Sequence, residues 1–406
     1  MRSLKRCLLV LFVAMLLWPV VRTQAVQETV AIEALAGFAN ESNGMVDQAT
    51  FDADREAFEE RDTIADGLGP VYNAQSCAEC HQNPVTGSSS QVTVMRAGHR
   101  DGAGNFFEAP GGSLINDRAI HYSLQERVTI DEDVRAFRSS LSTLGDGYVE
   151  AIDDATLMAI AASQPRDSGG MIAGQVIRVP LLEAPGQMRV GRFGWKNQHA
   201  SLLSFSADAY LNEIGITNRL LPRENTSMGH SVAAYDGVAD PEDNDNDIDA
   251  FARFMRATRV PPRDEALAAT DDAREGAEIF NQIGCAICHV PTINTAAAGT
   301  VINGGTFTVP PALGGKAIHP FSDFLLHDVG TGDGIVQNGG PATANKLRTP
   351  PLWGLHVRAR LMHDAATLTL DEAIRRHAGE ARDVVARYNG LRRARRTHLI
   401  AFLQSL

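Results

Sequence analysis

Hydrophobic residues recur at helical spacing in several stretches, most clearly in the second half of the chain. In 248–255 they occupy positions i, i+3, i+4 and i+7, the pattern of an amphipathic helix. The stretch 270–283 follows the same pattern behind Thr270, a residue type that caps helices. Gly276 within it leaves room for close crossing by another helix, and the apolar segment 399–406 is a suitable partner. These patterns predict two helices packed across each other.

Alternation of polar and apolar residues, the mark of strands, is confined to short stretches at 91–95 and 175–179. Residues 300–309 predict a hairpin that turns at Asn303-Gly304, a dipeptide favoured in two-residue hairpin turns. Further helices are expected at 154–163, at 201–211 and behind a cap at Thr50 or Asp52. The pattern as a whole predicts a mainly α fold with small β-hairpin elements and a long irregular insertion in the first half.

The pattern C-x-x-C-H occurs twice, at 77–81 and 285–289. It is the attachment signature of c-type haem. On a helical turn, residues i, i+3 and i+4 share a face, so two thiols can form thioethers with the haem while the next imidazole reaches the iron. The sequence therefore predicts two covalently attached c-type haems, held by Cys77, Cys80, His81, Cys285, Cys288 and His289.

Two other uses of these cysteines remain open from the sequence. The four thiols could form one zinc site, but the usual separation of such pairs is about 15 to 20 residues, and zinc gives no reason for a histidine after each pair. Each pair could instead be a redox dithiol, although neither follows a clear βαβ pattern. The fifth cysteine, Cys7, stands in a segment that we expect to be removed.

Residues 1–25 have the layout of a secretory signal peptide. Basic residues precede an apolar run from Leu8 to Val21, and Thr23-Gln24-Ala25 offers a cleavage site of the small-x-small kind. The run is short for a membrane span, and an uncleaved anchor is the alternative. We therefore expect an exported, periplasmic protein with no stable membrane span after cleavage.

Removal of this segment leaves 33 Lys and Arg against 49 Asp and Glu, a net charge of −16. Such a protein is not expected to bind nucleic acid, whereas it would attract a cationic partner protein. Solubility alone explains the same charge. A length of 406 residues allows two or three domains. We place a boundary at Pro261-Pro262, which gives an N-terminal haem domain at 26–261 and a C-terminal cytochrome c-like haem domain at 262–406.

An acidic run lies between Asp240 and Asp249, with aspartates at every second position from 243 onwards. Calcium binds such carboxylate clusters, but the glycine of an EF-hand loop is missing. The alternative is that these acids cap the positive end of the helix that follows. Calcium is therefore a second candidate cofactor beside the haems.

Beyond the two haem motifs, the chain resembles the di-haem oxidoreductases sometimes labelled thiol oxidoreductase-like, distant relatives of bacterial di-haem cytochrome c peroxidases and of MauG-type enzymes. The resemblance rests on 66–73, 191–196, 215–217, 320–328, 348–354 and 377–381. In the peroxidase relatives, a His-Asp-Gly-like motif near the second haem is followed about one helix later by the residue on its distal side.

This resemblance implies roles for individual residues around the second haem. His363 stands in the His-Asp-Gly-like element, with Ala365 in place of the usual glycine. His377 falls at the distal position, where the relatives carry Met or Tyr, so the second iron is expected to be ligated or lined by His377. Glu380, three residues later, is a candidate general acid.

Other candidates complete the expected electron path and the first haem. Trp353 or Trp195 could serve as a stepping stone between the haems, although core packing is the favoured role for either residue taken alone. For the sixth position of the first iron, His99 is a candidate and His121 competes with it. Thioether candidates are Met95 and Met362, a residue type more often found as core filler.

An iron with two strong protein ligands serves as a relay, whereas an iron with an open position can bind peroxide or oxygen. We therefore expect a peroxidase-like enzyme in which the haem at 77–81 accepts electrons from a soluble cytochrome c or cupredoxin and the haem at 285–289 activates hydrogen peroxide. The alternatives are a di-haem electron carrier without a substrate, and a MauG-like or oxygenase-like enzyme that oxidises an organic or protein substrate.

Overall fold

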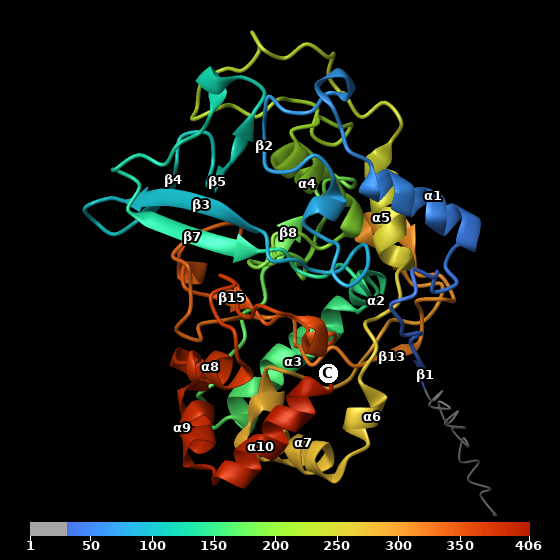
Figure 1. Ribbon diagram of the computed structural model, residues 1–406, viewed down its shortest axis with the longest axis vertical. Helices are drawn as coiled ribbons and strands as arrows, with labels where there is room; N and C mark the ends of the chain where they lie inside the picture. The colour runs from blue at the N-terminus through green and yellow to red at the C-terminus, as the bar shows by residue number, and fades with distance from the viewer. Residues whose placement is uncertain (1–30) are drawn as a thin grey trace, which may run out of the picture. The chain divides into compact units, whose positions relative to one another are not determined.

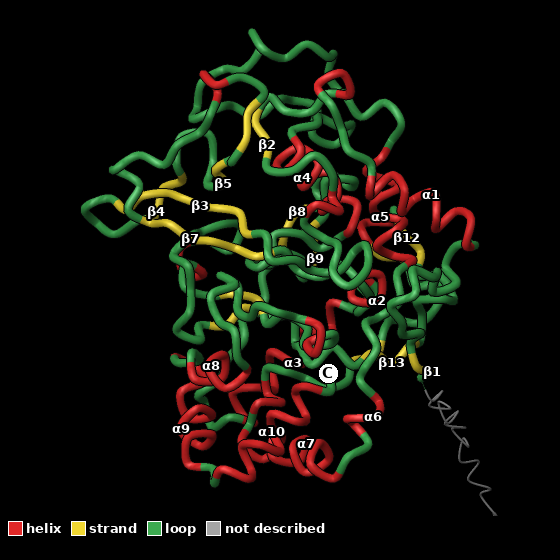
Figure 2. Tube along the Cα trace, in the orientation of Figure 1, coloured by secondary structure: helices red, strands yellow, loops and turns green. Residues whose placement is uncertain are grey.

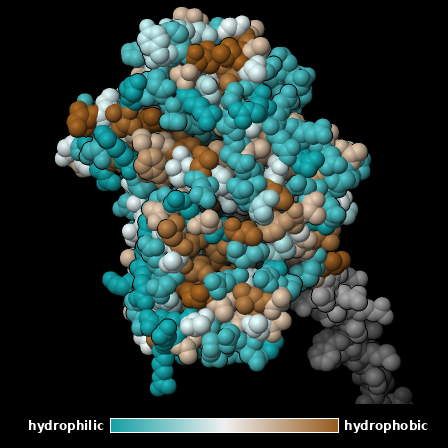
Figure 3. Space-filling view, in the orientation of Figure 1, coloured by the Kyte–Doolittle hydropathy of each residue, from teal (hydrophilic) through white to brown (hydrophobic). Residues whose placement is uncertain are grey.

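The computed structural model describes residues 31–406, and the expected signal peptide at 1–25 lies outside the described residues. Short helices and small sheets are connected by long loops, as Figure 2 shows. Within 31–406 no helix combines the length and the apolar character needed to cross a membrane. Figure 3 shows one face of the molecule, which is mostly hydrophilic and carries separate hydrophobic patches.

Ten α-helices are described in 31–406, and three of them are only one or two turns long. They are α1 (Gln48–Glu59), α2 (Asp146–Glu150), α3 (Asp154–Asp167), α4 (Leu202–Ala209), α5 (Asp247–Ala257), α6 (Glu265–Ala268), α7 (Asp271–Ile283), α8 (Leu370–Arg375), α9 (Arg382–Gly390) and α10 (Arg393–Gln404). The helices expected at 154–163, 201–211, 248–255 and 270–283 are thereby confirmed. The first helix is capped by Asp47, which accepts from the Thr50 amide, so the predicted cap at Thr50 or Asp52 was wrong.

The strands are short and form several separate sheets. They are β1 (Ile32–Glu33), β2 (Val71–Tyr72), β3 (Thr93–Arg100), β4 (Phe106–Glu108), β5 (Leu114–Ile115), β6 (Arg118–Ala119), β7 (Val134–Ser139), β8 (Arg178–Pro180), β9 (Met188–Val190), β10 (Ile293–Asn294), β11 (Val301–Ile302), β12 (Phe307–Thr308), β13 (Lys316–Ile318), β14 (Leu326–His327) and β15 (Leu347–Arg348). The largest sheet joins β3 to β4, β5 and β7. The antiparallel pairing of β11 with β12 confirms the predicted hairpin, but its connection is the four-residue segment 303–306 rather than a two-residue turn at Asn303-Gly304.

Two main apolar cores, beside several smaller apolar clusters, hold the described elements together. The larger one surrounds α1, α2, α4 and α5 and includes residues from both sides of position 261, among them Phe251 and Phe324. The smaller one lies between α7, α9 and α10, which gather at one end of Figure 1. The parallel pairing of β1 with β13 also ties the start of the described chain to its last third. The division into two haem domains at 261 stays a prediction.

The crossing of α7 and α10 follows from Gly276. A Cβ added there would lie 2.1 Å from the carbonyl oxygen of His398 and 2.7 Å from the Cβ of Phe402, so only glycine permits this approach. Thr270 caps α7 by accepting from the Ala273 amide, as predicted. At the other end Gly284 has φ 97°, a left-handed conformation that ends the helix and turns the chain into Cys285.

Acidic side chains before and at the start of α5 form local hydrogen bonds and ion pairs. Asp243 accepts from the amides of Asp247 and Ile248, which lie at the start of the helix, at 2.7 and 3.4 Å. Asp249 pairs with Arg219 at 2.6 Å. These contacts agree with the capping interpretation. Among the described residues the nearby carboxylates that come close enough to share a cation are Glu224, Asp240 and Glu242.

Candidate functional site: two cavities that share a wall

Each C-x-x-C-H motif forms a single tight turn rather than part of a longer helix. The turns cover Cys77–Glu79 and Cys285–Ile287. In both, the histidine amide bonds to the first cysteine carbonyl, at 3.1 Å for His81 and 3.0 Å for His289. The shared face expected for residues i, i+3 and i+4 is therefore present, although it arises from an isolated turn.

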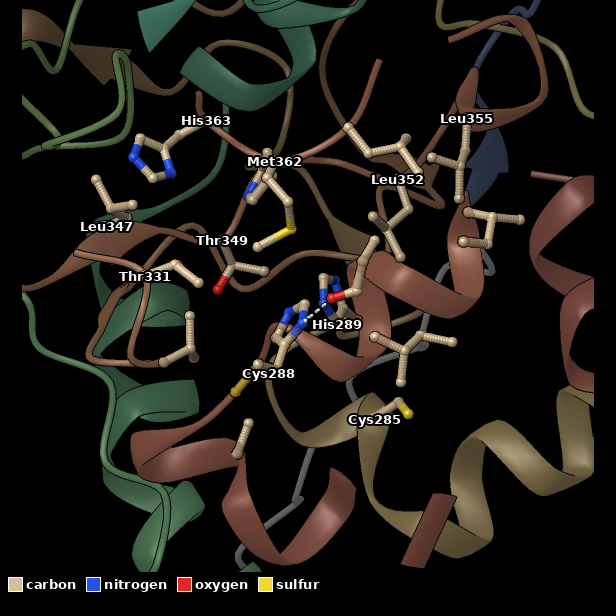
Figure 4. A pocket seen from close by; sticks show the side chains of 18 of the residues that line it. Cys285, Cys288, His289, Thr331, Leu347, Thr349, Leu352, Leu355, Met362 and His363 are labelled. Carbon is tan, nitrogen blue, oxygen red and sulfur yellow. Dashed lines mark hydrogen bonds between the residues drawn. The ribbon is translucent and has the colours of Figure 1, made fainter. Parts of the chain in front are cut away.

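Each motif lines its own cavity. The cavity at Cys285, of about 210 Å³, is enclosed by α7, α8, α9, α10 and the loop that precedes α8. Figure 4 shows Met362 and His363 on the side of this cavity opposite to Cys285 and Cys288. The cavity at Cys77, of about 190 Å³, is enclosed by the first motif, β3, β7, α4 and α5.

The two cavities share a wall, which we define as Ser139, Ser140, Leu141, Trp195 and Arg348. Trp195 donates its indole N–H to the Ser139 carbonyl at 2.8 Å. Arg348 donates its backbone amide to the Trp195 carbonyl at 2.8 Å and its Nε to the Gly194 carbonyl at 2.9 Å. These bonds fix the indole between the cavities, and of the two predicted stepping stones only Trp195 stands there.

Each motif imidazole is hydrogen-bonded through Nδ1, and within 31–406 no hydrogen bond to either Nε2 is found. The Nδ1 of His81 lies 3.2 Å from the Ser88 carbonyl, and the Nδ1 of His289 lies 3.0 Å from the Phe321 carbonyl. Because a carbonyl only accepts, each Nδ1 carries the hydrogen. Burial lowers the pKa of each histidine to about 4, so both rings are neutral at pH 7. A neutral imidazole with a free Nε2 is the form that binds a metal.

His377 is placed like a second ligand in the Cys285 cavity. Its ring centroid lies 6.5 Å from that of His289. Its Nδ1 donates to the Ala373 carbonyl at 2.8 Å, which leaves its Nε2 free as well. Burial lowers the pKa of His377, so this ring is also neutral. The structure therefore brings His377 and His289 together.

His363 lies in the wall of the same cavity, next to Trp195. The two rings meet edge to face with centroids 6.1 Å apart. The His363 side chain is buried, and its Nδ1 has no hydrogen-bond partner within 31–406. Met362 also lines the cavity, so its thioether stays a candidate ligand for the iron that the sequence predicts there.

Glu380 does not line the Cys285 cavity. Its carboxylate lies 2.8 Å from Nδ1 of His327, and His327 does line that cavity. The other nitrogen of His327 lies 2.8 Å from the carboxylate of Asp323. His327 lies in the segment 320–328, but no local pattern reveals its role, because its partner Glu380 is more than fifty residues away in the sequence.

Several candidates lie away from both cavities. His99 stacks on Phe107 with ring centroids 5.6 Å apart and approaches Glu132 at 3.4 Å. His121 stacks on Tyr235. Met95 packs in a small core beside Ile115. Trp353 is buried in the larger core. None of these four predicted residues lines either cavity, so the structure does not bring them to the motifs.

Polar side chains that sequence reasoning missed line the Cys77 cavity. They include Arg96, Arg138, Asp146, Gln198, Asp208, Asn212 and Glu213. Among the described residues that line the Cys77 cavity, His81 is the only histidine and Met255 the only thioether. Glu213 accepts from the Asn73 side chain at 2.8 Å, and burial raises the pKa of its carboxyl. Gln198 follows the glycine-rich segment 191–196, which was the one available signal.

The placement of the cysteines excludes a single site for all four thiols. Cys77 and Cys80 line one cavity, and Cys285 and Cys288 line the other, so the zinc alternative was wrong. Burial raises the pKa of Cys80 and of Cys285 to about 12, which keeps both thiols protonated at pH 7. A redox dithiol needs a lowered thiol pKa, so the geometry also disfavours the second alternative.

Comparison with protein families gives one decisive match. Residues 117–406 match the family described as "Di-haem oxidoreductase, putative peroxidase". The chain belongs to this family. It is an oxidoreductase of the di-haem kind, and the resemblance recognised from the sequence is confirmed. No curated protein matches the chain in a sequence search.

Solved structures of similar proteins are distant. The chain is similar to hydrazine synthase of Kuenenia stuttgartiensis, with 14% identity, full coverage of both chains and a TM-score of 0.41. It is similar to a MauG-like protein associated with microbial copper homeostasis, with 14% identity over 93% of each chain and a TM-score of 0.43. It is also similar to the diheme peroxidase BthA of Burkholderia thailandensis, with 15% identity over 79% of this chain and 94% of that chain and a TM-score of 0.32.

Proposed function

We propose that this enzyme is an exported di-haem c-type peroxidase. Covalent haems are attached at Cys77 and Cys80 and at Cys285 and Cys288, and the proximal ligands are His81 and His289. One observation carries the proposal: each motif lines a separate cavity and presents a neutral imidazole with a free Nε2 to it. A bound haem iron supplies electron transfer and, where a coordination position is open, peroxide binding.

The cavity walls fit such a group. Haem carries carboxylates, and the walls offer buried donors that lack a partner among the described residues. Nη2 of Arg138 is one of these donors, in a side chain that is 4% exposed, and Nε of Arg96 is another. Both arginines line the Cys77 cavity, and Arg348 lines both cavities. Buried guanidinium groups of this kind pair with carboxylates, so they would hold the haem side chains.

The two cavities differ in the way their residues would treat an iron. In the Cys285 cavity, His377 faces His289 with a free nitrogen, so two imidazoles would close that iron. In the Cys77 cavity, polar groups line the wall. Among the described residues that line this cavity, Met255 is the only thioether, and it packs in the larger core. We therefore assign the relay to the Cys285 haem and peroxide to the Cys77 haem. This reverses the assignment expected from the sequence.

We assign Glu213, one of the buried carboxyls that line the Cys77 cavity, as the acid that serves peroxide. Its raised pKa favours a protonated carboxyl, and the Asn73 amide orients that carboxyl at Oε2. Breaking an O–O bond requires a proton for the departing oxygen, which the carboxyl can donate. Gln198 on the same wall would orient the peroxide by hydrogen bonding. Trp195 would carry electrons across the shared wall.

The experiment that tests this function is steady-state turnover of the holoprotein. A reduced soluble cytochrome c or cupredoxin is mixed with hydrogen peroxide, and oxidation of the donor is followed optically. Two donor molecules oxidised per peroxide consumed would support the proposal. Absence of turnover with both donors would favour the electron carrier, and peroxide consumption that depends on an organic or protein substrate would favour the MauG-like alternative.

A further inference from the structure

His327 forms a charged group beside the second haem motif. It is buried, at 2% exposed, and both of its ring nitrogens face carboxylates at 2.8 Å, Nε2 to Asp323 and Nδ1 to Glu380. Ionised carboxylates only accept hydrogen bonds, so both nitrogens must carry hydrogens. The geometry therefore makes this ring an imidazolium.

The effects of the neighbouring groups on the pKa of His327 favour the same imidazolium state. Burial alone would lower the pKa of His327, but the charge and the hydrogen bond of Asp323, together with contacts to Cys288 and Glu380, raise it well above the ordinary value. The three groups Asp323, His327 and Glu380 are called the charged triad below. The triad carries one positive and two negative charges.

The triad is held rigidly by groups from other segments. Asp323 accepts from the Gln164 side chain on α3 at 2.6 Å and from the Leu325 amide at 2.9 Å. Glu380 accepts from the amides of Ala173 and Asp328, both at 3.0 Å. With these donors fixed, the charges cannot relax much when a neighbouring group changes its own charge.

The triad is also in contact with the haem attachment point. Nδ1 of His327 lies 3.8 Å from Sγ of Cys288, and His327 lines the Cys285 cavity. Cys288, Asp323 and His327 approach closely enough that their ligand atoms lie within 4.8 Å of one another. The sulfur concerned is the one that would form the thioether bond, so the imidazolium would lie beside the group held there.

We propose that the charged triad sets the reduction potential of the haem attached at Cys288, with the imidazolium raising it and the Glu380 carboxylate lowering it. The inference rests on haem attachment at this motif, as proposed above. Reduction adds one electron, supplied by the donor protein, and so adds one negative charge to the haem. A fixed cation nearby stabilises the reduced form, and a fixed anion stabilises the oxidised form.

The test is a spectroelectrochemical titration of both haems in the holoprotein at pH 8. H327Q should shift one midpoint potential downwards, so that the ratio of reduced to oxidised haem at a fixed potential falls roughly tenfold. E380Q should shift the same midpoint upwards by a similar factor, because the amide keeps an acceptor for His327 while the negative charge is lost. The other haem should not move in either variant.

The control is H319Q. His319 is an exposed histidine that also pairs with a carboxylate, Glu33, but lies outside both cavities. Its replacement should leave both midpoints unchanged. Opposite shifts in H327Q and E380Q support the inference, since general loosening of the loop would move both variants in one direction.

Shifts of equal sign, or no shift in either variant, overturn the inference. If H327Q fails to fold, the upward shift in E380Q and its absence in H319Q decide the matter. The proposed peroxidase function is separable from this result, because the midpoints are measured without peroxide. Absence of peroxide turnover by the wild-type protein would refute the proposed peroxidase function. The midpoint shifts would still support the role of the charged triad.

Discussion

The imidazole rings of His289 and His377 lie in one cavity with their centroids 6.5 Å apart and their planes inclined by 62°. Two metal–nitrogen bonds of about 2 Å each fit between rings at that separation. Both rings are anchored through Nδ1 to a backbone carbonyl, so both Nε2 atoms are free. We expect these two histidines to hold the iron of the relay haem.

Replacement of His377 by glycine should therefore change the optical spectrum of one haem only. The missing imidazole would convert a two-imidazole iron into one with an open position, whereas the Cys77 haem keeps its surroundings. The matched control is His99→Gly, which removes a histidine that lines neither cavity and should leave the spectrum unchanged. An unaltered spectrum in the His377 variant would remove this residue from the coordination of iron.

Replacement of both Cys285 and Cys288 by alanine should leave one covalent haem per chain. The two cysteine pairs line separate cavities, so loss of one pair leaves the other attachment intact. Haem staining of a denaturing gel and the mass of the chain measure the result. The matching double replacement at Cys77 and Cys80 should also leave one haem. Two haems in either variant would refute the attachment sites.

Replacement of Glu213 by glutamine should lower kcat/KM for peroxide by a factor of about 10² to 10⁴, the usual contribution of a general acid. Haem content should not change. Because burial raises the pKa of Glu213, its protonated form persists above the ordinary range of a carboxyl group. Wild-type activity should hold at low pH and fall as pH rises through that raised pKa, and the glutamine variant should lack this fall. The same decline in the variant would exclude Glu213 as the acid.

Replacement of Gly276 by alanine should destabilise the fold by about 3 kcal/mol or more, because the added methyl group would overlap backbone atoms of α10. Denaturant unfolding measures the free energy. Gly390 on α9 offers a control, since a Cβ there meets nothing within 4 Å. Equal unfolding free energies of the Gly276→Ala and Gly390→Ala variants would show that α7 and α10 can move apart without loss of stability.

Replacement of Ala365 by glycine should stabilise the protein by up to about 1 kcal/mol. Ala365 has φ 54°, a left-handed conformation that is unfavourable for a residue with a Cβ. The glycine expected from the family pattern would relieve this strain, although it adds freedom to the unfolded chain. A lower unfolding free energy in the variant would mean that the alanine methyl group packs well enough to outweigh the strain.

Local patterns predicted the parts of the fold that depend on neighbours in sequence. The cap at Thr270, the pairing of β11 with β12 and the crossing at Gly276 each follow from a few adjacent residues. The two haem motifs were found in the same way. These features need no knowledge of distant parts of the chain.

The contents of the cavities could not be predicted in this way, because they join distant positions. Glu213 bonds to Asn73, which lies just before the first motif, across more than a hundred residues. His327 and Glu380 meet only in the folded chain. His99 lies only 18 residues after His81 in the sequence, but it faces Phe107 and Glu132 at the far part of β3. Closeness in sequence was a poor guide to a ligand here.

The most direct measurement is a carbon monoxide titration of the fully reduced holoprotein, followed optically. The proposed arrangement predicts one carbon monoxide bound per chain, at the Cys77 haem, and two per chain in the His377→Gly variant. Binding of none in the wild-type protein would contradict an open site for peroxide. Binding of one that is lost when Cys285 and Cys288 are replaced would place the open iron in the other cavity and reverse the assignment.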